Sequence, residues 1–182
     1  MSEGRLILDS KRFRLTIERL CHHLIERYDD FQNACLIAIQ AGGTPLADRM
    51  HHLLLEILDI SHIEYGKLDI TFYRDDFRTR SKPFTASPTQ LNFPIENKQI
   101  ILVDDVLYTG RTVQAAMTAL NDYGRPATVE MVAMIDRRFN RHLPIRTDYA
   151  GMRVDAIADA YVKVEWEEIH GKDQVLLFGG DR

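Results

Sequence analysis

The stretch that decides the fold class covers residues 101–112 and reads Ile101-Leu102-Val103-Asp104-Asp105-Val106-Leu107-Tyr108-Thr109-Gly110-Arg111-Thr112. A hydrophobic strand leads into two adjacent carboxylates, and a turn with hydroxyls and a glycine then opens a helix. Free backbone N–H groups at a helix N-terminus bind phosphate, and a glycine lets the backbone approach it closely. Ionised carboxylates accept hydrogen bonds from the vicinal hydroxyls of a sugar. The stretch therefore predicts a ribose 5-phosphate site, in preference to an acidic turn before an ordinary capped helix.

Short apolar runs alternate with amphipathic helices on both sides of this stretch. Residues 34–39 form an unbroken apolar run, and residues 99–103 and 129–135 form two further, mostly apolar runs; such runs are typical of strands buried on both faces. Helices are expected from a cap at Asp9 or Ser10 to Tyr28, from a cap at Thr44 to residue 58, and over residues 112–123. This order predicts an α/β fold with a central parallel sheet flanked by helices, and ligand loops at the carboxyl ends of the strands.

Three further strands are expected outside the apolar runs. Residues 68–73 alternate between apolar and polar, and so do the stretches around residues 161–166 and 174–178. Ile57 and Tyr123 are expected on the inner faces of their helices, and Trp166 in the core or at an interface.

The composition is that of an ordinary globular domain. The chain has 182 residues, of which 45% are hydrophobic and 27% charged, with a formal net charge of -4. These values exclude a disordered or fibrous chain, and no apolar run is long enough to span a membrane. Cys21 and Cys35 lie in apolar segments and are interpreted as buried thiols of a reduced compartment, so we expect a cytoplasmic protein.

The stretch 101–112 resembles the phosphoribosyl-pyrophosphate signature of type I phosphoribosyltransferases. The closer resemblance is to the PyrR-type family of bifunctional pyrimidine operon attenuators and uracil phosphoribosyltransferases, and it covers nearly the whole chain. Outside the signature it is carried by residues 7–9 (Ile-Leu-Asp), 25–27 (Ile-Glu-Arg), 68–76 (Leu-Asp-Ile-Thr-Phe-Tyr-Arg-Asp-Asp), 124–126 (Gly-Arg-Pro) and 143–151 (Leu-Pro-Ile-Arg-Thr-Asp-Tyr-Ala-Gly). It implies one phosphoribosyltransferase domain over residues 1–182, with a small hood from about residues 1–10 and 136–182.

The resemblance implies transfer of ribose 5-phosphate from phosphoribosyl pyrophosphate to uracil, giving UMP and pyrophosphate, with Mg²⁺ as cofactor. The cation is expected mainly on substrate and water oxygens, with Asp105 as its candidate protein ligand. The catalytic candidates are Asp104, Asp105 and Arg74. Ribose 5-phosphate binding is assigned to Asp104, Asp105, Thr109, Gly110, Arg111 and Thr112, pyrophosphate binding to Ala41, Gly42, Gly43 and Arg74, and base binding, largely through backbone groups, to Asp136 and Arg137.

The chain departs from the family in the pyrophosphate loop. The family usually has Thr-Arg-Gly where this sequence has Ala41-Gly42-Gly43, so an arginine and a hydroxyl are missing. A charge-assisted hydrogen bond contributes about 1.5–3 kcal/mol, which predicts donor affinity weakened by about tenfold or more. We therefore expect a slow or weak transferase rather than an inactive one.

The family's second activity is UMP-dependent binding to the leader RNA of a pyrimidine operon. The basic candidates here are Arg19, His22, Arg138, Arg141 and Arg146. Glu18 and Met152 weigh against RNA binding because the family usually has a hydroxyl and a basic residue at those positions. The chain is also mostly acidic after residue 155. Solvated surface charge or a subunit interface is the alternative for these arginines, and the resemblance implies a homodimer or homotetramer.

Two alternative functions stay open: a UMP-sensing RNA-binding attenuator with little catalysis, and a phosphoribosyltransferase for another base. A 6-oxopurine enzyme is disfavoured because residues 130–135 lack the lysine expected there. The stretch from Asp75 to Asn97, with Arg78, Arg80 and Lys82, is interpreted either as a loop closing over the donor or as a solvated loop. The His22-His23 and His51-His52 pairs are interpreted as structural, because neighbouring histidines point to different helix faces.

Overall fold

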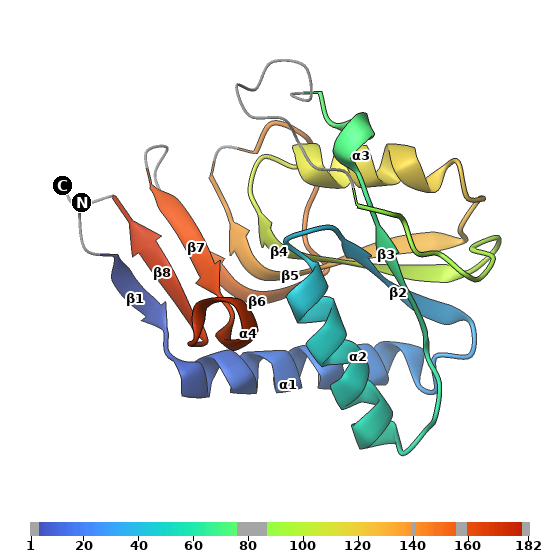
Figure 1. The fold of residues 1–182 in the computed structure, drawn as a ribbon, viewed down its shortest axis with the longest axis horizontal. Coiled ribbons are helices and arrows are strands. Elements are labelled where there is room, and N and C mark those ends of the chain that lie inside the picture. Colours follow the sequence, from blue (N-terminus) through green and yellow to red (C-terminus); the bar gives the residue numbers. More distant parts are fainter. Residues whose placement is uncertain (1–3, 76–86, 140, 156–159, 180–182) are drawn as a thin grey trace.

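The computed structural model describes residues 4–75, 87–139, 141–155 and 160–179. Its main body is a parallel sheet with the strand order β3-β2-β4-β5-β6 (Figure 1). The strands are β2 (Ala34–Ile39), β3 (Glu64–Leu68), β4 (Gln99–Leu107), β5 (Thr128–Arg137) and β6 (Tyr149–Val154). The three apolar runs lie in β2, β4 and β5, which confirms the predicted central sheet.

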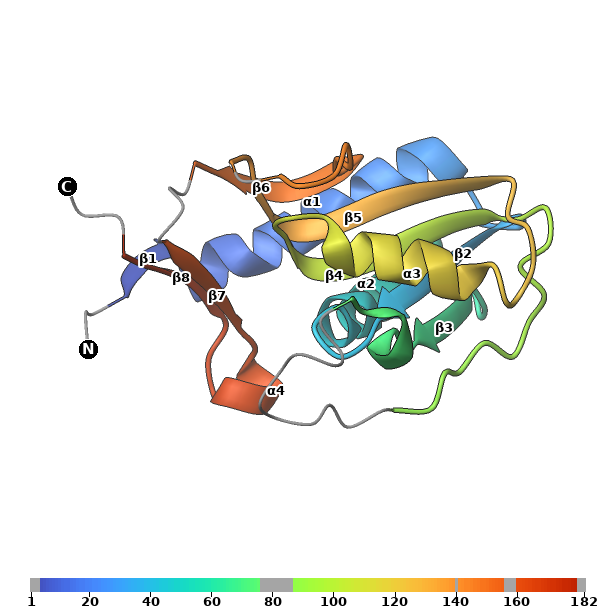
Figure 2. The same cartoon turned by 90° about the horizontal axis from the view of Figure 1, so that it is seen from above.

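Helices cover both faces of this sheet (Figures 1 and 2). The helices α1 (Ser10–Tyr28) and α2 (Thr44–Leu58) share a core with Leu36 and Val103, while α3 (Arg111–Leu120) shares a core with Ile37 and Leu102. Neighbouring strand residues thus point to opposite faces, and both faces are apolar because both are covered. In the described part of the chain, no helix is long and apolar enough to cross a membrane.

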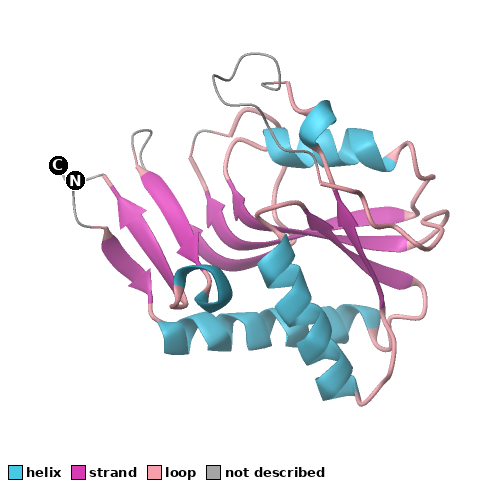
Figure 3. Ribbon diagram, viewed as in Figure 1, coloured by secondary structure: helices cyan, strands magenta, loops and turns pink. Residues whose placement is uncertain are grey.

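A small antiparallel sheet forms the hood beside the main sheet (Figure 3). It consists of β1 (Arg5–Leu8), β8 (Gln174–Phe178) and β7 (Tyr161–Glu165), in that order, with α4 (Glu167–His170) between β7 and β8. Trp166 is buried and meets the Phe13 ring edge-on at 5.0 Å, which confirms it as a core residue. Strand β6 pairs with β5 in the main sheet, so within the expected 136–182 region only β7 and β8 supply hood strands.

Several predicted boundaries are wrong. The strand expected over residues 68–73 ends at Leu68, and the 3₁₀ turn η1 (Thr71–Tyr73) follows it. Asp69 causes this turn because its carboxylate accepts hydrogen bonds from both the backbone N and the hydroxyl of Thr71, at 2.9 and 2.5 Å. Helix α3 ends at Leu120, so Tyr123 is exposed rather than inward.

The N-terminal cap of α1 agrees with its prediction, whereas the cap of α2 and the position of Ile57 differ from theirs. Asp9 caps α1 and accepts a hydrogen bond from the Arg12 backbone N at 2.8 Å, as predicted. Helix α2 has Gly43 as its cap, so Thr44 is its first residue and not its cap. Ile57, near the end of α2, is exposed and was wrongly placed on the inner face.

Candidate active site

The two predicted ribose-binding carboxylates lie in the last part of β4, where the strand extends past its neighbour. Pairing with β2 ends at Val103, whereas pairing with β5 continues from Asp104 opposite Ala133 to Leu107 opposite Asp136. The strand is thus longer than the predicted 99–103. The carboxylates therefore occupy the carboxyl edge of the sheet, where ligands bind in open parallel sheets.

Burial shapes the electrostatics of this pair. Burial raises the pKa of Asp104 well above its usual value, the charge of Asp105 raises it further, and the charge of Arg74 opposes the shift. Burial also raises the pKa of Asp105, opposed by the hydrogen bond that its carboxylate accepts from the Val106 N–H at 2.7 Å. The site thus holds two carboxylates whose charged form is disfavoured, and a ligand that donates hydrogen bonds or adds positive charge would relieve this.

The predicted phosphate loop has the expected backbone geometry. Gly110 has φ = +92° and caps α3, a left-handed conformation that favours glycine. Arg111 donates from its backbone N to the Thr109 hydroxyl at 3.4 Å, and its guanidinium forms an ion pair with Asp75. The N–H groups of the first turn of α3 therefore lie directly after the carboxylates, as the phosphate prediction requires.

The predicted pyrophosphate loop touches the carboxylates from the neighbouring strand. A Cβ added to Gly42 would lie 2.8 Å from Asp105 Oδ1, and one added to Gly43 would lie 2.1 Å from the Val103 carbonyl oxygen. The loop after β2 therefore packs against the end of β4 with no room for a side chain at 43. The peptide bond between Gln40 and Ala41 is cis.

The predicted base-binding residues end the next strand, β5. Asp136 is buried and accepts hydrogen bonds from the Arg141 guanidinium at 2.5 Å and from the Thr147 hydroxyl at 2.8 Å. Arg137 is also buried, and its guanidinium lies 3.7 Å from the centre of the Tyr108 ring. Tyr108 immediately precedes the phosphate loop, so the ends of β4 and β5 are joined by this stack.

The segment after β5 packs onto the phosphate loop. Arg141 donates to the Tyr108 carbonyl oxygen at 2.5 Å, and the His142 backbone N donates to the Thr109 carbonyl oxygen at 3.0 Å. Ile145 lies within 3.4 Å of a Cβ added to Gly110. The predicted ribose, phosphate and base residues therefore form one connected region along the carboxyl edge of β2, β4 and β5.

The comparisons with known proteins agree with this geometry. Residues 5–168 match the family model for the phosphoribosyl transferase domain. The chain is 40% identical over 182 residues to the bifunctional protein PyrR of Caldicellulosiruptor bescii, covering 100% of this chain and 99% of the relative. The chain belongs to the PyrR family of phosphoribosyltransferases. The PyrR of Haemophilus ducreyi is 41% identical over 175 residues, covering 95% of this chain and 96% of that one.

Solved structures with the same fold include more distant phosphoribosyltransferases. The HGPRT-ase from Leishmania tarentolae in complex with GMP matches with a TM-score of 0.72 and 14% identity, over 97% of each chain. A hypoxanthine-guanine phosphoribosyltransferase from Bacillus anthracis matches with a TM-score of 0.70 and 13% identity, covering 97% of this chain and 98% of that one. At such identities the likeness shows the shared fold alone.

The basic residues predicted for RNA are not all gathered in one place. Arg19 on α1 donates to the Gly151 carbonyl oxygen of β6, and it lines one surface pocket with His23 and Arg153. Arg146 lines a second surface pocket, and Arg153 lines that one too. His22 is exposed on α1. Arg19, Arg146 and Arg153 therefore share the β6 edge of this PyrR-family chain.

The other two predicted RNA residues have partners elsewhere. Arg138 makes a two-pronged ion pair with Asp155, with both contacts at 2.5 Å. Arg141 has a side chain only 18% exposed and bonds Asp136 and the Tyr108 carbonyl oxygen, as described above. The structure thus connects Arg141 to the ends of β4 and β5 rather than to the β6 edge.

Some residues of the site were missed in the sequence. Tyr108 follows Leu107, which pairs with Asp136, so a register prediction between β4 and β5 would have found its stack on Arg137. Arg153 gave no signal of its own, because it joins the β6 edge only through the fold. Arg78, Arg80 and Lys82 lie outside the described residues.

Proposed function

We propose that this PyrR-family protein transfers ribose 5-phosphate from phosphoribosyl pyrophosphate to uracil, giving UMP and pyrophosphate, and that it also acts as a UMP-responsive regulator. The observation that carries the proposal is the adjacent pair of Asp104, which is buried, and Asp105, which is partly buried, directly before the glycine-capped N-terminus of α3. In this arrangement a diol-binding pair and a phosphate-binding turn follow each other, which suits the two polar ends of a ribose 5-phosphate.

Each predicted residue takes one role in this proposal. Asp104 and Asp105 hold the ribose hydroxyls, and the loop after β2 together with Arg74 faces the pyrophosphate. The 5-phosphate lies on the turn formed by Thr109, Gly110, Arg111 and Thr112. The packing of Gly42 against Asp105 supports this order, because in the donor pyrophosphate is attached to the same ribose that the carboxylates hold.

Mg²⁺ fits this site as a cation held mainly by substrate and water. The described residues contain no group of three or more histidine, cysteine or acidic side chains that could hold a metal ion by themselves. Asp104 and Asp105 are nevertheless oxygen donors of the kind that Mg²⁺ prefers, and burial leaves their negative charge poorly stabilised. When bound, the cation would offset the charge of the departing pyrophosphate, with Asp105 as its candidate protein ligand.

The chain's own residues act by positioning and electrostatics. The carboxylates fix the ribose at its hydroxyls, and the α3 N-terminus fixes it at the phosphate, so that C1′ is held still between pyrophosphate and base. Both carboxylates also lie near the ring where positive charge builds up as the bond to pyrophosphate breaks. No protein nucleophile is required for this transfer.

A UMP sensor with little catalysis is the second candidate, because the Ala41-Gly42-Gly43 loop lacks a side-chain donor for pyrophosphate. A panel of nucleobases, each incubated with phosphoribosyl pyrophosphate and Mg²⁺, tests both candidates. We expect slow UMP formation from uracil and none from cytosine or hypoxanthine. Binding of UMP with no base consumed would replace the transferase with the sensor, and consumption of another base would correct the substrate.

For the regulator we propose that RNA binds along the β6 edge, at Arg19, Arg146 and Arg153. Phosphate contacts make RNA affinity fall with salt, so each lost contact reduces the salt slope by about one. Filter binding of a pyrimidine-operon leader RNA against salt, with and without UMP, tests this. We expect Arg153→Gln to reduce the slope by about one, and an affinity that UMP does not change would reject the regulator.

The family resemblance also carries the proposals about assembly and location. We expect one domain over residues 1–182, a homodimer or homotetramer, and a cytoplasmic protein. Light scattering on the purified chain measures the oligomeric state, and a monomer would contradict the expected homodimer or homotetramer.

A further inference from the structure

Arg137 is a buried cation with unused hydrogen-bonding capacity. Its residue is 4% exposed, and within the described part of the chain its Nε and Nη2 atoms have no hydrogen-bond partner. These two nitrogens lie on the same edge of the guanidinium, which is the edge that binds acceptors in a two-pronged fashion. Leaving buried donors unpaired costs stability, and such groups in native structures call for an explanation.

The guanidinium is positioned by a stack on an aromatic ring, and the residue before Arg137 is also fixed. It stacks on the Tyr108 ring at 3.7 Å, and the preceding residue, Asp136, is fixed by Arg141 and Thr147. Cation–π stacking leaves the in-plane N–H groups of an arginine available to a ligand. The unpaired donors therefore belong to a guanidinium that the stack on Tyr108 holds in a defined orientation.

The strand order says which part of the substrate lies there. Strand β4 carries the ribose carboxylates, with β2 on one side and β5 on the other. The loop after β2, which packs on Asp105, faces the pyrophosphate in our proposal, and Arg137 ends β5 on the opposite side. In the transfer, the base attacks C1′ from the side opposite to pyrophosphate. Arg137 therefore lies on the side of the base.

We infer that Arg137 donates from Nε and Nη2 to an exocyclic carbonyl oxygen of the base and stabilises the negative charge that the base gains in the reaction. This rests on the proposed transfer to uracil and adds a specificity-determining residue to it. In that step the N1–C1′ bond forms with the nitrogen's electron pair, and the C1′–O bond breaks with its pair leaving on pyrophosphate. The N1 proton passes to water, so the base is most anionic before the new bond is complete.

A base with a carbonyl group at this place accepts both hydrogen bonds, whereas one with an amino group there presents N–H against N–H. The side chain thus favours oxo-pyrimidines over amino-pyrimidines. The sequence predicted base contacts largely through backbone groups, and Arg137 adds a side-chain contact to them. A more acidic base should depend less on the Arg137 guanidinium, because such a base becomes anionic more readily by itself.

The test compares Arg137→Gln and Arg137→Lys with the wild type on uracil and on the more acidic 5-fluorouracil. We expect Arg137→Gln to lower kcat/KM for uracil by about 10- to 100-fold, the equivalent of one or two lost charge-assisted hydrogen bonds. The loss should be several-fold smaller with 5-fluorouracil, and Arg137→Lys should recover part of the uracil activity. Equal losses on both bases would overturn the inference.

Two controls separate this role from a structural one. Arg125→Gln removes an exposed arginine just before the amino end of β5, and we expect it to leave both activities unchanged. Arg137→Met should unfold at the same or a higher temperature than the wild type without ligand, because it removes the unpaired buried donors. A fall in the unfolding temperature together with equal losses on both bases would assign Arg137 to structure.

The outcomes also separate the inference from the proposed function. If the wild type consumes no base, the transferase itself is rejected. If it consumes uracil and Arg137→Gln does so equally well, only the inference fails. If the variant weakens the binding of ribose 5-phosphate and of UMP to the same extent, the guanidinium serves the phosphate and not the base, which again overturns the inference.

Discussion

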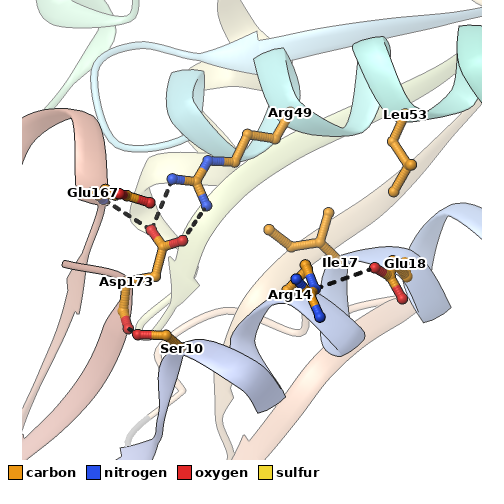
Figure 4. A pocket seen from close by; sticks show the side chains of 8 residues that line it. All are labelled: Ser10, Arg14, Ile17, Glu18, Arg49, Leu53, Glu167 and Asp173. Atoms are coloured by element: carbon orange, nitrogen blue, oxygen red, sulfur yellow. Dashed lines mark hydrogen bonds and ion pairs between the residues drawn. The ribbon is translucent and has the colours of Figure 1, made fainter.

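Two charged clusters of the molecule differ in how their charges are satisfied. Arg49 on α2 bonds both carboxylate oxygens of Asp173, at 2.8 and 2.7 Å (Figure 4). It also bonds Glu168 at 2.5 Å, and its guanidinium lies 5.3 Å from the centre of the Trp166 ring. At the end of β4, the buried Asp104 and the partly buried Asp105 are instead neighbouring carboxylates, and the pKa of each is raised. The first cluster joins α2 to the hood, and the second faces the proposed substrate.

The pKa shifts of the two clusters have opposite directions. Burial alone would raise the pKa of Asp173, but the hydrogen bonds from Arg49 and from the Glu167 N–H hold it below its usual value. Burial and the charge of Asp105 instead hold the pKa of Asp104 well above its usual value. The charges of the Arg49 cluster are therefore satisfied within the fold, whereas the charge of the carboxylate pair is disfavoured, as expected for the binding role that we propose.

The largest effect is expected for Asp104→Asn. We expect kcat/KM for phosphoribosyl pyrophosphate to fall by about 100-fold, since charge-assisted bonds to the ribose hydroxyls are lost. We also expect a higher free energy of unfolding at neutral pH. Because the raised pKa makes the folded state bind its proton more tightly than the unfolded chain does, wild-type stability falls as pH rises from about 4 through the folded-state pKa.

Initial rates and thermal unfolding between pH 4 and 8 check both halves of this prediction. The stability difference between Asp104→Asn and the wild type should widen as pH rises. A variant that loses activity and stability together would place Asp104 with the structural charges.

The opposite result is expected at the hood. Arg49→Met leaves the acidic side chains of Asp173 and Glu168 without their partner, and we expect the free energy of unfolding to fall by about 2 kcal/mol. The arginine side chain is 27% exposed, so a value below that of a fully buried pair is expected. The activity per folded molecule should not change.

Acid should remove most of the Arg49 effect. Because the pKa of Asp173 is lower in the folded protein than in the unfolded chain, its ionisation stabilises the fold at pH values above the unfolded-chain pKa. This stability is lost as the pH falls through the folded-state pKa. Chemical denaturation at pH 7 and in acid measures the change. Arg14→Met is the matched control: its ion pair with Glu18 spans 3.6 Å at 73% side-chain exposure, and a change within about 0.5 kcal/mol is expected.

Local chemistry made the ribose-phosphate half of the site predictable. Residues 101–112 contain the carboxylates, the glycine and the helix start in one continuous stretch, so their spacing along the chain is also their spacing in space. The buried strands were equally clear because both faces of the sheet are covered. Two predicted boundaries were wrong. The strand expected over residues 68–73 ends early because the Asp69 side chain forms a turn, and the helix expected to reach Tyr123 ends at Leu120, with Asn121 as its cap.

The long-range half could not be predicted in the same way. The stack of Arg137 on Tyr108 depends on the register of β4 against β5, and the link from Arg141 to Asp136 depends on the path of the segment after β5. The sequence therefore predicts Arg141 only as a basic candidate for RNA under the family resemblance, and its bonds to Asp136 and Tyr108 cannot be predicted from it. Arg153 was missed because only the fold brings it between Arg19 and Arg146.

A smaller effect is expected at the proposed pyrophosphate loop. We expect Gly42→Arg to lower the Kd for phosphoribosyl pyrophosphate by about tenfold relative to Gly42→Ala, because it supplies a charged donor that this loop lacks. The alanine variant is the matched control, since its Cβ alone would lie 2.8 Å from Asp105 Oδ1 and push on that carboxylate. Equilibrium binding separates the two, and equal affinities would show that the loop binds through its backbone alone.

The smallest effect is expected where a satisfied pair lies inside the proposed site. Arg111, on the phosphate loop, forms an ion pair with Asp75, and both side chains are about half exposed, at 51% and 53%. Exposed pairs contribute about 0.2–1 kcal/mol, so the phosphate of a ligand can displace Asp75 at little cost. Asp75→Asn should therefore tighten ribose 5-phosphate binding by about two- to fivefold without lowering stability, as measured by calorimetry and thermal unfolding. Weaker binding would mean that Asp75 holds Arg111 in the orientation that the phosphate needs. The Arg111–Asp75 ion pair would then contribute to ligand binding as well as to the fold.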